Sequence, residues 1–253
     1  MTTDPLPLLI LIGRPASGKS EIIEHLRGLQ AGRRLAEFGL GELTVLDDFP
    51  YLWSWMEEDR LLESRLRQPR LHTDARGFFL YAHLWDLLIE RLATTYLAGL
   101  AELKTGAAAR SFIIEFSRGA EHGGYQRALN RFDAAILSRA ALMYVDVTFE
   151  ESLRKNRRRF NPARPGSILE HSLSDEKMTR LYREDDWPTL SRDDPRFLSL
   201  AGRRVPYVVF ENQDDVTTRQ PEALDRRLRE RLSTLHALWR AAQADRTRET
   251  PSR

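Results

Sequence analysis

The sequence of 253 residues contains no cysteine. This absence excludes disulfide bonds, thiolate metal ligands and cysteine nucleophiles. Long hydrophobic runs are also missing: the apolar stretch 6–12 includes a proline, follows no basic leader and is far too short to span a membrane. No spacing among the six histidines indicates a zinc site. We therefore expect a cytoplasmic protein without a membrane partner.

An excess of charge of one sign is absent as well. The formal net charge is only +2, although 30% of the residues are charged. This balance argues against a surface devoted to nucleic acid but allows a local basic patch. Hydrophobic residues make up 42% of the chain, which is enough for an ordinary folded core. A chain of this length fits one α/β domain, with or without a small lid.

Short apolar runs alternate with helical patterns along the chain. They predict five buried strands, over 8–12, 43–46, 111–115, 142–147 and 205–210. Helices are expected over 18–29, 51–67, 79–92, 125–139, from 149 to just before 161, from 172 or 174 to 182, and from 221 onward. The stretch 185–202 looks irregular. This alternation predicts a parallel sheet with helices on both faces, which binds ligands beyond the carboxyl ends of its strands.

One loop carries a specific phosphate-binding pattern, G-x-x-x-x-G-K-[ST], in the residues Gly13, Arg14, Pro15, Ala16, Ser17, Gly18, Lys19 and Ser20. It follows a predicted strand and opens a predicted helix, so backbone N–H groups and the helix N-terminus would face phosphate oxygens. Lys19 should reach the β- and γ-phosphates, and the Ser20 hydroxyl should bind Mg²⁺. We include Glu21 among the nucleotide-binding residues. The alternative, a chance match in a glycine turn, does not require this strand–loop–helix setting.

The sequence resembles the P-loop kinases of nucleosides, nucleotides and small metabolites. The resemblance rests on the strand layout, the phosphate loop (Walker A), the acidic strand ends and an arginine-rich segment late in the chain. It implies ATP and Mg²⁺ as donor and cofactor, and the sequence has no N-K-x-D motif for reading guanine. It also implies one three-layer domain over 1–253 with a five-stranded parallel sheet, a helical acceptor region over 50–105 and a lid-like segment over 154–190. Residues 243–253 should form a flexible tail.

Asp47 and Asp48 end the second predicted strand, where uridine-kinase-like and pantothenate-kinase-like enzymes carry an aspartate that accepts the proton of the attacking hydroxyl. A carboxylate within hydrogen-bond reach of that hydroxyl would orient it for attack. Successive strand residues face opposite ways, so only one of the two should face the phosphates. The sequence leaves open which one acts, and Asp48 is also a candidate metal ligand. The alternative is a solvated turn before Pro50.

Glu115 ends the third predicted strand, and Arg118 follows it. A carboxylate beside the phosphate-loop strand can hold Mg²⁺ directly or through water, while Arg118 could contact substrate or phosphate. Deoxynucleoside kinases carry a Glu-Arg-Ser motif in a comparable place, but here the arginine comes three residues after the glutamate. The alternative is a strand-end carboxylate that merely pairs with an arginine.

A basic cluster follows the fourth predicted strand and consists of Arg154, Lys155, Arg157, Arg158 and Arg159. Adenylate-kinase-like enzymes carry lid arginines at this point in the chain, and these neutralise the transferring phosphoryl group. We assign that role to Arg154 and Arg158, which share a helical face. Arg164, Arg180 and Arg183 could join them. The alternative is a solvated basic face paired with Glu150 or Glu151.

Two further regions are candidates for substrate contacts. Segment 50–105 carries aromatic residues that could stack on a flat acceptor, although such spacing is more common in a core: Trp53, Trp55, Phe78, Phe79, Tyr81 and Trp85. The polar segment 211–214 follows the fifth predicted strand, where related kinases pack a loop against adenine. An ordinary polar turn explains it equally well.

The leading hypothesis is an ATP- and Mg²⁺-dependent kinase for a small hydroxyl- or phosphate-bearing molecule, such as a nucleoside, nucleotide or related metabolite. Lys19, Glu115, Arg118, Arg154, Arg158 and one of Asp47 and Asp48 would form its catalytic site. One alternative is a kinase of RNA, tRNA or a nucleic-acid end, suggested by the basic segment 154–164. A second is a non-catalytic, nucleotide-dependent switch or partner-binding ATPase. The acceptor and the oligomeric state do not follow from the sequence.

Overall fold

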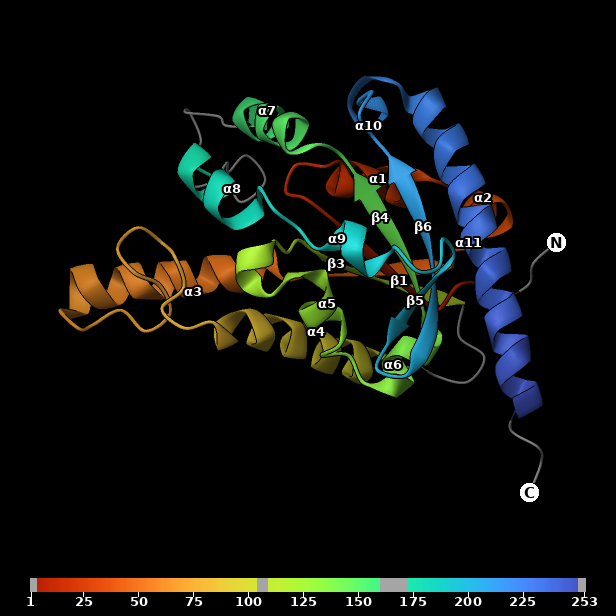
Figure 1. Ribbon diagram of the computed structural model, residues 1–253, viewed down its shortest axis with the longest axis horizontal. Coiled ribbons are helices and arrows are strands. Elements are labelled where there is room, and N and C mark those ends of the chain that lie inside the picture. The colour runs from red at the N-terminus through yellow and green to blue at the C-terminus, as the bar shows by residue number, and fades with distance from the viewer. Residues whose placement is uncertain (1–3, 104–108, 160–172, 250–253) are drawn as a thin grey trace.

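The computed structural model describes residues 4–103, 109–159 and 173–249. Its centre is a six-stranded sheet with the strand order β2-β3-β1-β4-β6-β5 (Figure 1). All neighbouring pairs except β5–β6 are parallel. The strands are β1 (Leu8–Gly13), β2 (Glu42–Asp47), β3 (Arg110–Phe116), β4 (Ala140–Asp146), β5 (Phe197–Leu200) and β6 (Arg203–Glu211).

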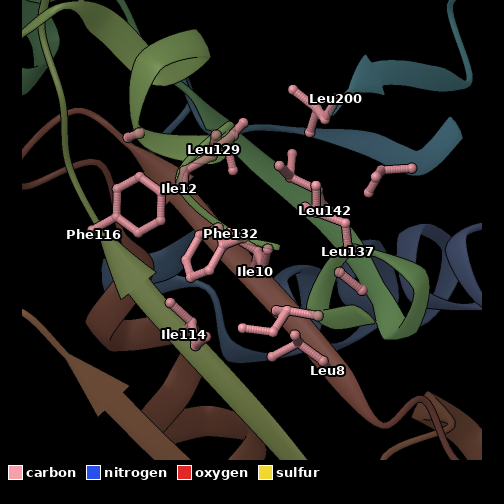
Figure 2. Packing of buried hydrophobic residues seen from close by; sticks show 14 of the residues in the cluster. Leu8, Ile10, Ile12, Ile114, Phe116, Leu129, Phe132, Leu137, Leu142 and Leu200 are labelled. Carbon is pink, nitrogen blue, oxygen red and sulfur yellow. The ribbon is translucent and has the colours of Figure 1, made fainter. Parts of the chain in front are cut away.

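Strand β1 is apolar throughout because both of its faces are buried. Leu8, Ile10 and Ile12 belong to one core, whereas Leu9 and Leu11 belong to the other. This alternation is the two-residue period of a strand with helices on both sides. Figure 2 shows the first core, in which the side chains of β1 lie among those of neighbouring strands and helices.

Helices cover both faces of the sheet. The first core contains side chains from α4 (His83–Ala101), α5 (Gly124–Leu129) and α6 (Ala134–Arg139). The second core contains side chains from α1 (Lys19–Gly28), α2 (Ala31–Phe38) and the long α11 (Pro221–Glu249). None of the described helices is long and apolar enough to cross a membrane.

Most of the remaining helices lie around the carboxyl ends of the strands or beyond one edge of the sheet, whereas the short α9 contributes Trp187 to the first core. The carboxyl ends of β4 and β6 point toward α7 (Phe149–Arg159) and α10 (Val216–Arg219) (Figure 1). Helix α3 (Phe49–Leu61) continues into a π-helical turn (η1, Leu62–Leu66) and extends away from the sheet. The others are η2 (Ala120–His122), α8 (Asp175–Tyr182) and α9 (Trp187–Leu190).

The prediction of five strands was wrong, because a sixth, β5, pairs antiparallel with β6 at the sheet edge. It lies in the stretch that had looked irregular. A four-residue strand is too short to show the alternation of buried and exposed residues that identifies a strand. The turn that joins it to β6 is also short and is formed by Ala201 and Gly202, with φ of 45° and 71°. The predicted helix 79–92 begins only at His83, and the predicted helix 125–139 is two short helices.

Candidate active site

The phosphate loop connects β1 to α1 and leaves no room for larger residues at its glycines. A Cβ atom on Gly13 would lie 2.7 Å from the carbonyl oxygen of Val145. Gly18 has a φ of 112°, and a Cβ atom there would lie 2.5 Å from Nδ2 of Asn212. Ala16 adopts a φ of 56°, which is unfavourable for a residue with a side chain. The loop is therefore held in a strained conformation against β4 and the segment after β6.

Lys19, the first residue of α1, folds back over this loop. Its Nζ donates to the carbonyl oxygens of Gly13 and Arg14, at 3.1 and 2.9 Å, and to Oγ of Ser117 at 2.9 Å. It lies 3.9 Å from Oε1 of Glu115. Burial lowers the pKa of Lys19, and the charge of Glu115 opposes that change. The ammonium group is thus held at the loop by acceptors that an incoming phosphate could replace.

Two carboxylates meet Lys19 at the carboxyl ends of neighbouring strands. Asp47 of β2 and Glu115 of β3 are register partners. Burial raises the pKa of Glu115 to about 7, against the opposing charge of Lys19. Burial, followed by the charge of Asp48, raises the pKa of Asp47 to about 6. The backbone N–H of Phe49 donates to Oδ1 of Asp47 at 2.9 Å. Both carboxyl groups are therefore poised to change protonation near neutral pH.

Asp48 has a different environment from that of Asp47. Its Oδ2 accepts a hydrogen bond of 2.7 Å from Arg118, whose side chain is only 2% exposed. Arg118 also donates to the carbonyl oxygens of Ser117 and Trp85. In the part of the chain that the structure describes, no arginine or lysine nitrogen lies within 4.0 Å of the Asp47 carboxylate. Asp48 and Arg118 therefore form a buried ion pair that joins the ends of β2 and β3.

These groups surround a cavity of about 470 Å³. Its lining includes the predicted residues Pro15, Ala16, Lys19, Ser20, Glu21, Asp47, Asp48, Glu115 and Arg118. A second cavity of about 160 Å³ adjoins it, and four residues line both: Leu52, Trp85, Leu173 and Tyr182. The structure thus brings the phosphate loop and three predicted carboxylates to one space, which continues into the segment 50–105 that was predicted to bind the acceptor.

Arg154 and Arg158, predicted to face the phosphates, lie outside this cavity. Arg154 donates to Glu151 at 2.7 Å, and both arginines donate to Asp215, at 3.3 and 3.2 Å. The cavity is lined instead by Arg159, which donates to Glu21 at 2.8 Å. Whether an arginine of α7 lines the cavity depends on its position around the axis of this helix. Arg164, another candidate, lies outside the described residues.

Arg14 uses its side chain to anchor the loop and does not face the cavity. It donates to the carbonyl oxygens of Val147 and Tyr182, at 3.0 and 3.2 Å, and forms a 2.8 Å ion pair with Asp185. Its side chain does not line the cavity. Arg14 and the two glycines of the loop would therefore offer a nucleotide only their backbone atoms.

The oxygen atoms at this site suit a hard cation such as Mg²⁺. Ser20 has an exposed hydroxyl, and Glu115 and Asp47 supply carboxylate oxygens. Within the described ranges, no group of three or more acidic, histidine or cysteine side chains could hold a metal ion by itself. Mg²⁺ commonly uses one or two carboxylates and completes its shell with water and phosphate oxygens. Asp48 fits the predicted metal role poorly, because Arg118 occupies its Oδ2.

Comparison with known proteins gives only remote similarities. No family model matches the sequence, and no curated protein matches it. Among solved structures, a sugar kinase from Janibacter sp. HTCC2649 is 14% identical, with a TM-score of 0.40 over 92% of this chain and 98% of that chain. The protein TT1252 from Thermus thermophilus is 17% identical, with a TM-score of 0.42 over 93% of this chain and 98% of that chain. These values do not assign the chain to a family. The evidence for its α/β architecture is the sheet described above, with helices on both faces.

Proposed function

We propose that this chain is an ATP- and Mg²⁺-dependent phosphotransferase that acts on a small hydroxyl- or phosphate-bearing acceptor. The observation that supports it best is the position of Lys19, Asp47 and Glu115 around one cavity at the phosphate loop. A buried cation, carboxylates and a helix N-terminus are groups that phosphoryl transfer uses, since its catalysis consists mainly of positioning and charge neutralisation.

In this proposal the triphosphate lies along the loop between β1 and α1. The N-terminal N–H groups of α1 have no partner within the helix and face the loop, so they bind phosphate oxygens. Lys19 exchanges its carbonyl acceptors for the β- and γ-phosphates, and Arg159 leaves Glu21 to neutralise the same charge. Ser20 and Glu115 hold Mg²⁺, which would neutralise charge on the phosphates when bound.

Asp47 is the base in this proposal, and Asp48 is a positioning residue. The acceptor hydroxyl donates to Asp47, and its oxygen attacks the γ-phosphorus. The bond from this phosphorus to the β,γ-bridging oxygen breaks, ADP leaves with that electron pair, and the hydroxyl proton passes to Asp47. A pKa of about 6 keeps Asp47 mostly ionised at neutral pH yet able to accept a proton. Asp48 acts through Arg118, which ties together the two strand ends.

The nucleic-acid alternative is less favoured because the described part of the basic cluster is already neutralised. Arg154 and Arg158 contact Asp215, Arg157 contacts Asp175, and Arg159 contacts Glu21. Binding a nucleic-acid backbone would require these pairs to break. Retention of RNA by the pure protein at low salt would support the alternative.

The test follows the γ-phosphate of labelled ATP in the presence of Mg²⁺ and a panel of hydroxyl- and phosphate-bearing metabolites. We expect label on at least one acceptor, and loss of transfer in Lys19→Met and Asp47→Asn. Asp193→Asn, a change to an exposed aspartate outside both cavities, should transfer at the wild-type rate. Slow release of inorganic phosphate that no acceptor alters and that Asp47→Asn leaves unchanged would instead support the switch alternative.

A further inference from the structure

The second cavity is small, largely apolar and separate from the phosphate loop. Its volume is about 160 Å³. Apolar side chains supply most of its lining: Leu52, Met56, Phe78, Phe79, Ala82, Trp85, Leu173 and Leu181. An apolar cavity of about 150 Å³ in another protein holds one benzene molecule. The volume of the cavity therefore matches one six-membered ring more closely than a fused pair of rings.

Aromatic rings form the walls of this second cavity. Phe79 and Trp85 are in edge contact, with ring centroids 4.5 Å apart. Trp85 also stacks on His122, with ring centroids 3.7 Å apart, and burial lowers the pKa of His122 to about 3, so this imidazole is neutral. The guanidinium of Arg180 lies over the ring of Phe78, 4.3 Å from the ring centroid. Such walls favour a flat unsaturated ring.

The loop that forms one wall is fixed by a buried carboxylate. Asp59 of α3 is fully buried and accepts hydrogen bonds from the backbone N–H groups of Leu71 and Thr73, at 2.7 and 2.6 Å. The Thr73 hydroxyl also donates to Asp59 at 2.7 Å and accepts from Arg70 at 2.9 Å. Thr73 forms a β-bridge with Phe79. The loop is thus fixed without a ligand, and the hydroxyl of the lining residue Thr73 already has both a donor and an acceptor as partners.

Among the described residues, one cation at this cavity is available to a ligand. Lys177 lines it, with Nζ 5.8 Å from the centroid of Phe78. Within the described ranges, no carboxylate lies within 4.0 Å of this nitrogen. Burial lowers the pKa of Lys177, and the charge of Asp74, farther away, opposes that change. Arg180, the other lining cation, already pairs with Glu121 at 2.8 Å. An anionic group on a ligand would therefore meet Lys177.

We propose that the second cavity binds the acceptor of the phosphotransferase, and that this acceptor is a single unsaturated ring with an anionic group directed at Lys177. The inference rests on the function proposed above. The hydroxyl of the same acceptor extends past Trp85 and Tyr182, which line both cavities, toward Asp47. A sugar fits less well, since each ring hydroxyl left without a partner here would cost roughly tenfold in affinity.

The test measures calorimetric binding of four probes to the full chain: para-hydroxymethylbenzoate, its neutral amide, the naphthoate homologue and gluconate. We expect the benzoate to bind at least tenfold more tightly than each of the others. Lys177→Met should remove its advantage over the amide, and Lys177→Arg should restore most of it. Arg240→Met removes an exposed charge outside both cavities and should change nothing.

ATP binding, measured on the same samples, separates this inference from the function it rests on. If ATP binds in a Lys19-dependent way but gluconate or the naphthoate binds as tightly as the benzoate, the ring assignment is wrong and the phosphotransferase proposal stands. The same conclusion follows if Lys177→Met leaves the preference for the benzoate over the amide unchanged. If ATP does not bind, both proposals are wrong, whatever the benzoate does.

Discussion

The two neighbouring aspartates should respond in opposite ways to substitution. Asp48→Ala leaves the guanidinium of Arg118 buried without its carboxylate. Removing one partner of a buried ion pair typically costs about 3 to 5 kcal/mol. Arg118 keeps the carbonyl oxygens of Ser117 and Trp85 as acceptors, so we expect a loss of about 3 kcal/mol, the lower end of that range.

Asp47→Asn should leave stability nearly unchanged and remove activity. The asparagine oxygen can still accept the hydrogen bond from Phe49, and the change removes a carboxylate whose ionisation burial and Asp48 both oppose. We expect the free energy of unfolding to stay within about 1 kcal/mol of wild type. The rate of phosphoryl transfer should fall by about a hundredfold to ten-thousandfold, as is typical when a general base is lost.

Urea unfolding, followed by tryptophan fluorescence, and initial transfer rates test this contrast directly. A loss of about 3 kcal/mol should lower the urea midpoint of Asp48→Ala by about 1 M or more. Asp47→Asn should unfold near the wild-type midpoint. The reasoning is refuted if Asp48→Ala unfolds like wild type, or if Asp48→Asn abolishes transfer while Asp47→Asn does not.

Three further changes test the phosphate loop. Lys19→Met should weaken binding of MgATP roughly tenfold to a hundredfold, measured by calorimetry, because hydrogen bonds to a charged group are lost. Binding of MgATP to wild type should strengthen as the pH rises from about 5 to 8, by up to about tenfold per pH unit for each proton released. The reason is that Glu115, with a pKa of about 7, must ionise to hold the cation, and that the negative charge of Asp47, with a pKa of about 6, attracts the cation once it forms. Gly18→Ala should lower the free energy of unfolding by about 1 to 3 kcal/mol, because the φ of 112° is strained for alanine and its Cβ would crowd Asn212.

Two of these predictions have a matched comparison. A Cβ atom on Gly28, at the end of α1, would meet nothing within 4 Å, so Gly28→Ala should be neutral or stabilising by up to about 1 kcal/mol. Glu115→Gln should lower the pH at which MgATP binding is half-maximal, toward the pKa of Asp47, about 6. Equal destabilisation by both glycine changes, or an affinity that is constant across this pH range, would contradict the assignments.

The sequence predicted the sheet well where burial leaves a clear pattern. Strand β1 is apolar because both of its faces are covered, and its predicted span, 8–12, lies within the observed Leu8–Gly13. Strand β5 could not be predicted because it is only four residues long and is held by pairing with β6. Helix α4 begins later than expected because Phe79 packs in the loop against Trp55 and Trp85.

The candidate site was predictable where residues lie at the ends of strands. It was less predictable where the orientation of a side chain decides whether that side chain lines the cavity. Lys19, Asp47 and Glu115 line the cavity as expected, since parallel strands bring their carboxyl ends to one edge. The choice between Arg159 and its neighbours depends on the rotation of α7, which a run of consecutive basic residues does not reveal. The burial of Asp59 depends on a loop more than ten residues away in sequence and gave no local signal.

A crystal structure with Mg²⁺ and a non-hydrolysable ATP analogue would test the central claim most directly. The account predicts the triphosphate along the loop from Gly13 to Ser20, Lys19 within hydrogen-bond reach of the γ-phosphate, and that phosphate facing Asp47 and the second cavity. A triphosphate bound elsewhere, or a γ-phosphate directed away from Asp47 into solvent, would contradict it.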